Sequence, residues 1–509
     1  MSKNRLGPNL LHSRVKEMFG FIRTKMGLPT LFEQVPQSSK YKWKGTIGIV
    51  GLDPNAVAEL NIGIVKYANN VGLTEDQHIP EIISVGVPTK DVRLLESQVE
   101  LCKAMGADVI AFPQETKSSN ISLNLQNRFK IPVHSITNNC DIDDLAKITL
   151  NNAMDIQYPI RPDILFHGDN NDMVTGIQED ARARNKRIDK IIQGYGGFPV
   201  LSDPFTGIIG GAGPLASAQL SVKLAKERAP FVHVSANSAP GKHLYEIQKG
   251  PSYVPTYASI YDFLRKIGSY NIVVPCNTAH MRLNEFSKNN TSSIIDIRKS
   301  VMDVNINEAG FILLGTNRTV GVNCNDETGL YEQLRHEYPD QGPFYVPSEE
   351  QQDKIMEAIF DVKAGKLEKA KETIFLITKS LRERYGDIKV ILGCTELPLV
   401  FTTLELAENG FIDPAQDMAE MAGKDLEKEN VRRDEAKHSP EKTQAPSENN
   451  PKEEEATSKT TKNPIEQKPN TTINNHDFKN KDAKSSIKSV SQLSNVQGND
   501  QNNSKGGLG

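Results

Sequence analysis

One pattern, an apolar strand followed by a glycine turn and a helix, occurs in two separate parts of this chain. Residues 45–51 (GTIGIVG) begin the first occurrence, and residues 207–213 (GIIGGAG) begin the second. Further apolar runs and helix-like stretches alternate after each of them. Strands that alternate with helices in this way are typical of a parallel sheet with helices on both faces. The sequence therefore predicts an α/β fold made of repeated lobes with parallel sheets.

The two parts match at a constant spacing, which indicates an internal duplication. Gln114 lies 162 positions before Cys276 (276 − 114), and the residue before each of them is proline. Coincidental likeness between two α/β units is the alternative explanation. Because an amide does not titrate where the second copy carries a thiol, we expect the first copy to be a degenerate lobe without proton chemistry.

Changes in composition divide the chain into six parts. We expect a basic N-terminal segment (1–43), the degenerate lobe (44–140), a helical linker (141–205), two catalytic lobes (206–305 and 306–423) and a tail (424–509). The last catalytic lobe is expected to contain strands at 311–314, 320–322 and 389–392. The tail is rich in Lys, Glu, Asn, Ser and Thr, with Phe478 as its only aromatic residue. Such a segment buries too little apolar surface to offset its ordering entropy, which predicts disorder.

The overall composition excludes several classes of protein. A chain of 509 residues is long enough for two or three domains. Its formal net charge of −4 gives no electrostatic reason to expect binding to nucleic acid or to an anionic membrane, and its apolar runs are too short to cross a bilayer. The five cysteines show no disulfide or zinc-ligand spacing. Free thiols favour a cytoplasmic location, with export of the protein as the alternative.

Two of the cysteines occur in matching contexts. Cys276 and Cys394 each follow an apolar run and precede small polar residues that can begin a helix. This arrangement predicts two thiols at the carboxyl ends of strands, the edge at which open α/β sheets bind ligands. Taken singly, each cysteine would be interpreted as a small buried apolar residue. As a pair, two thiols that face each other can remove a proton from one side of a carbon and deliver one to the other side.

Four motifs within residues 206–401 resemble the aspartate/glutamate racemase superfamily, and most closely its aspartate racemase branch. They are GGAGPLA at 210–216, PCNTAH at 275–280, LLGT at 313–316 together with Thr319, and GCTELP at 393–398. Glu396 favours the aspartate branch, because glutamate racemases usually have histidine there. The resemblance implies racemisation of a small acidic amino acid without a cofactor or metal. It also implies that Cys276 and Cys394 alternate as base and acid.

Further residues are candidates for substrate binding. Side chains and backbone near the thiols can bind a carboxylate or, in the alternative interpretation, only cap helices and form turns: Asn277, Thr278, Thr395, Glu396, Thr316, Thr319, Gly211 and Gly213. The family has an arginine in the loop after the second strand, where this chain has Lys242. It also has a lysine in the helix before the last strand, and Lys354 fits that place.

Three questions stay open from the sequence. Lysine lacks the planar fork with which arginine grips a carboxylate, so Lys242 leaves glutamate or another acidic amino acid as an alternative substrate. A non-catalytic binding or regulatory protein on a racemase scaffold is the alternative to an enzyme. Racemases of this type commonly form homodimers, and the degenerate lobe would then either mimic or block a partner subunit.

Overall fold

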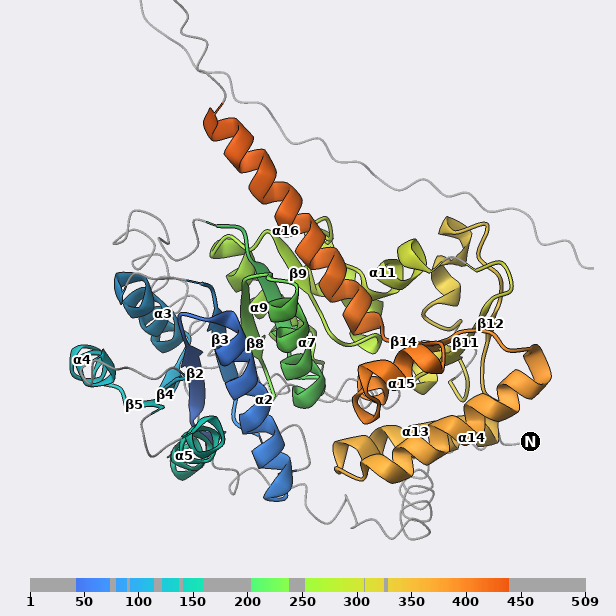
Figure 1. Cartoon of the computed structure of the whole chain (residues 1–509), viewed down its shortest axis with the longest axis horizontal. Helices are drawn as coiled ribbons and strands as arrows, with labels where there is room; N and C mark the ends of the chain where they lie inside the picture. The colour runs from blue at the N-terminus through green and yellow to red at the C-terminus, as the bar shows by residue number, and fades with distance from the viewer. Residues whose placement is uncertain are drawn as a thin grey trace, which may run out of the picture. The chain divides into compact units, whose positions relative to one another are not determined.

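The computed structural model describes nine stretches of the chain: residues 43–73, 79–88, 92–113, 121–136, 141–158, 203–237, 252–305, 307–324 and 328–438. Lys242, Gln114, most of the basic N-terminal segment and the tail beyond residue 438 lie outside the described residues. We name three lobes by their residues: an N-terminal lobe (43–158), a middle lobe (203–305) and a C-terminal lobe (307–412). The predicted α/β fold of repeated lobes with parallel sheets is confirmed (Figure 1).

The N-terminal and middle lobes share one eight-stranded sheet of order β10-β9-β7-β8-β3-β2-β4-β5. The N-terminal lobe supplies β2 (Thr46–Val50), β3 (Ile82–Gly86), β4 (Ala107–Phe112) and β5 (Val133–Ser135). The middle lobe supplies β7 (Thr206–Gly210), β8 (Phe231–Ser235), β9 (Asn271–Val273) and β10 (Ile294–Ile295). Neighbouring strands are parallel, except that β3 and β8 pair antiparallel where the lobes meet.

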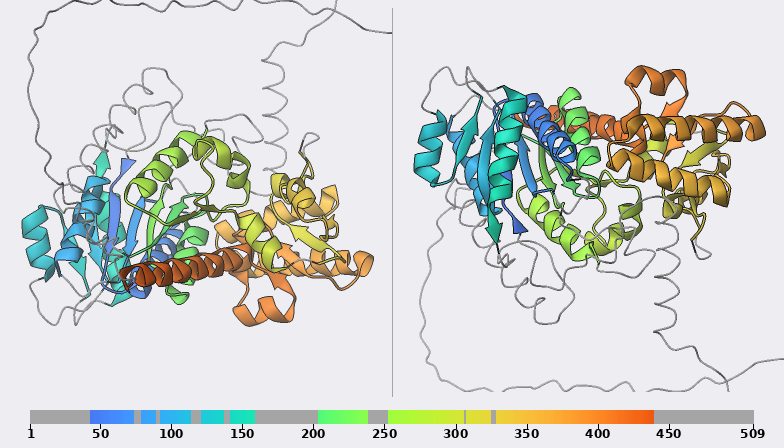
Figure 2. Two further views of the ribbon diagram at one scale, coloured as in Figure 1. Left: turned by 90° about the horizontal axis from the view of Figure 1, so that it is seen from above. Right: turned by 90° about the horizontal axis from the view of Figure 1, so that it is seen from below.

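Helices cover both faces of this sheet (Figure 2). Each face has its own apolar core. One core contains side chains from α3 (Val92–Ala104), α4 (Ile121–Phe129), α9 (Val254–Lys266) and α10 (Leu283–Phe286). The other contains side chains from α2 (Pro54–Asn70), α5 (Ile142–Asp155), α7 (Pro214–Lys226), α11 (Ile297–Val304) and α16 (Pro414–His438). Because α5 buries Leu145 and Leu150 in this core, it is part of the N-terminal lobe rather than of a linker.

The C-terminal lobe has a smaller parallel sheet of order β12-β11-β13-β14. Its strands are β11 (Phe311–Leu314), β12 (Phe344–Tyr345), β13 (Val390–Leu392) and β14 (Phe411–Ile412). Its helices include α13 (Glu349–Lys363), α14 (Leu367–Tyr385) and α15 (Thr403–Glu408). Short helical turns are η4 (Glu332–Glu337) and η5 (Leu397–Val400). A two-stranded ribbon of β1 (Trp43–Lys44) and β6 (Gln157–Tyr158) completes the fold.

Two local expectations differ from the structure. The strand expected at 320–322 is replaced by a one-turn helix, α12 (Asn317–Val320). Thr316 caps this helix by accepting from the backbone N–H of Thr319, and Gly321 ends it with a left-handed φ of 78°. Residue 424 is too early for the expected start of the tail, because α16 continues to His438 and Leu426 is buried. Among the described residues, no helix combines the length and the apolar character that crossing a membrane requires.

Candidate active site

The structure brings the two cysteines together where the middle and C-terminal lobes meet. Cys276 follows β9 and Cys394 follows β13, as expected from the runs before them. The residues beside the two thiols are bonded across the junction, because Thr395 Oγ1 donates to Pro275 O at 3.1 Å. Charge on Cys276 also acts on Cys394 and contributes to raising its pKa. The two thiols therefore belong to one site.

A chain of hydroxyl groups crosses the same junction. The Oγ1 atoms of Thr278 and Thr316 lie 3.0 Å apart, and those of Thr316 and Thr319 are also 3.0 Å apart. Thr278 belongs to a short helical turn, η3 (Thr278–Arg282), after the first cysteine, whereas the other two threonines begin α12. The predicted threonines therefore line up beside the cysteines, where their hydroxyl groups also tie the two lobes together.

The carboxyl group of Glu396 lies within hydrogen-bond distance of the second cysteine. The Cys394 thiol donates to Glu396 Oε2 at 2.9 Å, and the two residues are only 7% and 6% exposed. Burial raises the pKa of the Cys394 thiol well above its usual range, and the negative charge of Glu396 raises it further. Cys394 therefore holds its proton in the resting state. Lys363 Nζ lies 3.6 Å from Glu396 Oε1 and partly compensates the buried carboxylate.

The glycine turn after β7 packs against this carboxylate. Gly213 has a φ of 124°, and a Cβ atom built there would lie 2.2 Å from Glu396 Oε1. Gly211 has a φ of 103°, and its Cβ would lie 2.1 Å from the carbonyl oxygen of Ala236. Both positions need glycine for the backbone conformation and for the close approach. Gly213 thus lets the start of α7 approach Glu396 closely, whereas Gly211 lets the turn approach the backbone of Ala236.

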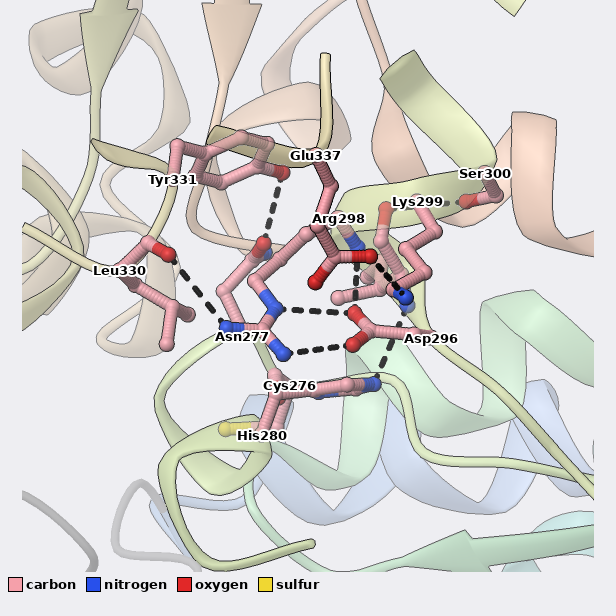
Figure 3. A network of polar contacts seen from close by, with 11 residues as sticks. Cys276, Asn277, His280, Asp296, Arg298, Lys299, Ser300, Leu330, Tyr331 and Glu337 are labelled. Carbon is pink, nitrogen blue, oxygen red and sulfur yellow. Dashed lines mark hydrogen bonds and ion pairs between the residues drawn. The ribbon is translucent and has the colours of Figure 1, made fainter. Parts of the chain in front are cut away.

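A network of polar contacts fixes the loop that carries Cys276 (Figure 3). His280 Nδ1 donates to the carbonyl oxygen of Cys276 at 2.8 Å, while its Nε2 accepts from the backbone N–H of Ile297 at 3.1 Å. Burial lowers the pKa of His280, which keeps the imidazole neutral and its two nitrogens in these separate roles. His280 therefore connects the backbone of the first cysteine to the beginning of α11.

Asn277 follows Cys276, and among the described residues only the oxygen of its side-chain amide has a hydrogen-bond partner. Tyr331 OH donates to Asn277 Oδ1 at 2.9 Å (Figure 3). The amide nitrogen Nδ2 of Asn277 is buried and has no hydrogen-bond partner among the described residues. The segment that carries Tyr331 is anchored by Arg298, which bonds the carbonyl oxygen of Leu330 at 3.4 Å and pairs with Asp296 at 2.6 Å. An unsatisfied buried donor next to the thiol leaves one position for an acceptor from a ligand.

Lys354, the candidate for substrate binding, is a surface residue of α13. Lys354 lies on the solvent side of α13, where it pairs with Glu350 at 2.8 Å with half of its side chain exposed. Lys363, nine residues later (363 − 354), is the lysine of this helix that contacts Glu396. At about 100° per residue, nine residues turn a helix through about two and a half turns, so these two lysines lie on opposite faces. The helical phase was the signal that sequence interpretation missed.

A small cavity adjoins Glu396. Its volume is about 20 Å³, room for about one water molecule. The middle and C-terminal lobes line it with Gly213, Leu215, Ala216, Val362, Lys363, Glu396 and Leu399, and the N-terminal lobe lines it with Val65, Asn69 and Ile79. All three lobes therefore contribute to the surroundings of Glu396.

Comparison with known proteins gives the class of the domain that holds this site. A model of the Asp/Glu/hydantoin racemase family matches residues 210–422. An aspartate racemase from Picrophilus torridus is 24% identical with a TM-score of 0.38, over 44% of this chain and 94% of that one. An aspartate racemase homologue from Pyrococcus horikoshii OT3 is 22% identical with a TM-score of 0.35, over 44% of this chain and 99% of that one.

The family match confirms the resemblance that the four sequence motifs indicated. Residues 210–422 belong to the Asp/Glu racemase superfamily. They include both cysteines, Glu396 and Lys363, and they leave out the N-terminal lobe entirely. The class of activity that this membership supports is that of a racemase.

Proposed function

We propose that this protein is a cofactor-independent racemase that interconverts L- and D-aspartate, with two cysteines as its acid and base. The observation that carries the proposal is the bond between the two cysteine motifs, from Thr395 Oγ1 to Pro275 O at 3.1 Å. This bond holds one thiol from each of two lobes at a common junction. Each side of a bound molecule then has its own group for proton transfer.

The chemistry needs both groups. Racemisation passes through a planar carbanion, so one group takes the α-proton from one face and the other supplies a proton to the opposite face. In one direction the Cys276 thiolate takes the α-proton, the electron pair of the C–H bond stays on carbon, and the Cys394 thiol delivers its own proton. The raised pKa of Cys394 supports this assignment, because it keeps that thiol protonated before the step.

Glu396 makes the opposite direction accessible. There Cys394 is the base and must first lose its proton, and the Glu396 carboxylate 2.9 Å away is an acceptor within reach. Lys363 Nζ lies 3.6 Å from the other oxygen of this carboxyl group. One proton then moves between the Cys394 sulfur and the Glu396 carboxyl group when the direction of the reaction changes.

Two features support an acidic amino acid as the substrate. The unpaired Nδ2 of Asn277 is a buried donor for the α-carboxylate, next to the hydroxyl groups of Thr278 and Thr316. Lys242, which lies outside the described residues, is the proposed partner for the second carboxylate. Lysine binds a carboxylate as a point charge rather than as a planar fork, so glutamate is the alternative substrate.

The test is to incubate the full chain with a panel of L-amino acids and to measure the D-enantiomers by chiral chromatography. We expect activity with aspartate and loss of activity in both Cys276→Ala and Cys394→Ala. Lys354→Ala, on the solvent side of α13, is the matched control and is expected to stay active. If either cysteine variant racemises at the wild-type rate, the two-thiol mechanism is wrong. Silence across the panel would favour a binding protein on a racemase scaffold.

A further inference from the structure

The N-terminal and middle lobes are copies of each other in strand order. Read outward from their junction, one half of the large sheet is β3-β2-β4-β5 and the other is β8-β7-β9-β10. Helix α2 begins at Pro54, eight residues after Thr46 (54 − 46), and α7 begins at Pro214, eight residues after Thr206 (214 − 206). The strands of one half, and the helix after its first strand, therefore have counterparts in the other half.

The two copies meet with the symmetry of a dimer. In the antiparallel pair, Ile82 at the start of β3 lies opposite Ser235 at the end of β8, and Gly86 lies opposite Phe231. Exchanging the two strands leaves this register unchanged, with Ser84 and His233 facing each other at its centre. Helices α2 and α7 pack against each other beside this pair (Figure 1). This is the geometry of an isologous contact between two subunits about a two-fold axis.

The residues at the centre are no longer those of a symmetric contact. Two identical chains would place histidine against histidine, whereas here His233 faces a serine. His233 Nδ1 lies 3.0 Å from Asn61 Nδ2 on α2 and 3.0 Å from Ser221 Oγ on α7. Burial lowers the pKa of His233 to about 3, so the imidazole is neutral.

A second asymmetry lies at the edge of the same pair. A Cβ atom at Gly86 would lie 2.5 Å from the ring of Phe231, so this ring fits only against glycine. The position in β8 that corresponds to Gly86 is Ser235, the last residue of that strand. The face of the middle lobe is therefore shaped to fit the N-terminal lobe and not a second copy of itself.

We propose that the N-terminal lobe is a built-in partner, which occupies within one chain the interface that a second copy of the middle lobe would use. The chain is then a monomer, in place of the homodimer that the sequence left open. The lobe covers strand β8, which would otherwise be an exposed sheet edge open to unwanted pairing. It also supplies Val65, Asn69 and Ile79 to the wall of the cavity beside Glu396.

The first test uses the full wild-type chain and does not depend on its activity. We expect light scattering to give a mass near 56.3 kDa. We also expect the amides of 82–86 and 231–235 to exchange hydrogen equally slowly at two protein concentrations about a hundredfold apart, because an interface within one chain does not dissociate on dilution. Amides of 311–314, inside the C-terminal lobe, are the internal control. A dimer whose 231–235 amides lose protection on dilution would overturn the proposal.

The second test disrupts the interface from the N-terminal side. Ser84 is fully buried, so Ser84→Arg is expected to separate β3 from β8 and to remove the slow hydrogen exchange of the 231–235 amides. Leu123→Arg adds the same charge to the same lobe at a side chain that is 51% exposed, and it is expected to remain monomeric. A folded, monomeric Ser84→Arg chain with unchanged protection at 231–235 would contradict the assignment of this surface. If the variant does not fold, the dilution experiment on the wild type still decides.

Discussion

Helix α16 carries a carboxyl group that makes the stability of the protein depend on pH. Asp417 accepts from Asn305 Nδ2 at 3.1 Å, where α16 packs against α11 of the middle lobe. Partial burial and the charges of Glu420 and Asp413 raise the pKa of Asp417 from 3.8 to about 7. The folded protein therefore binds this proton more tightly than the unfolded chain does.

The sign and size of the effect follow from the two pKa values. Well below pH 3.8 the Asp417 carboxyl is protonated in both the folded and the unfolded state, so a change of pH in this range does not alter stability through this group. Between 3.8 and about 7 the unfolded chain releases the proton first, so rising pH destabilises the fold. At about 1.4 kcal/mol for each pH unit, the loss reaches about 4 kcal/mol above pH 7. Asp417→Asn removes this loss, so we expect the variant to exceed the wild type by roughly 2–4 kcal/mol at about pH 8.

The assay is urea unfolding followed by circular dichroism between about pH 4.5 and 8, with the difference between variant and wild type as the readout. This difference is expected to grow with pH, from about 1 kcal/mol or less at the acid end. Asp425→Asn is the matched control on the same helix, because Asp425 is 37% exposed and pairs with Lys428 at 3.4 Å. Its difference from the wild type should stay within about 0.5 kcal/mol throughout. Parallel curves for wild type and Asp417→Asn would refute the reasoning.

Three further predictions concern the site. Glu396→Gln should lower kcat about 10²–10⁴-fold. It should also lower the pH at which Cys394 loses its proton, because it removes the negative charge beside the thiol. The pH profile of kcat/KM measures this shift, and an unchanged profile would contradict a role of Glu396 in proton transfer. Lys363→Met should lower kcat about 10–100-fold by leaving Glu396 as an uncompensated buried charge, while Lys354→Met should match the wild type in the same assay. Gly213→Ala should lower the free energy of unfolding by about 1–3 kcal/mol together with activity, and wild-type values for both would show that the glycine contact with Glu396 is unimportant.

Much of the fold and of the site was accessible from the sequence because it depends on local patterns. The strands before Cys276 and Cys394 are short apolar runs that end in small polar residues, and each forms the strand that its pattern predicts. The strand and glycine turn that begin each lobe were visible as short local motifs, and the family motif GCTELP placed Glu396 two residues after the second thiol. These features need only neighbouring residues to be read correctly.

What the sequence could not supply depends on phase and on long-range pairing. Whether Lys354 or Lys363 faces the site is decided by where α13 begins, since a difference of half a turn moves a side chain to the opposite face. The strand expected at 320–322 failed because capping by Thr316 and the left-handed Gly321 form a helical turn instead. The junction of β3 with β8 joins residues that lie far apart in the chain, and a local pattern does not specify such a partner.

The central claim is that two thiols act on opposite faces of one substrate carbon, and the isotope content of the product tests it most directly. L-aspartate is incubated with the enzyme in deuterated water, and the reaction is stopped at low conversion. The two enantiomers are then separated, and the deuterium content of each is measured by mass spectrometry. If one thiol removes the proton and the other delivers a different one, the D-aspartate formed carries deuterium while the recovered L-aspartate remains unlabelled. D-aspartate that retains the original hydrogen would mean that a single group carries the proton across, and it would contradict the account.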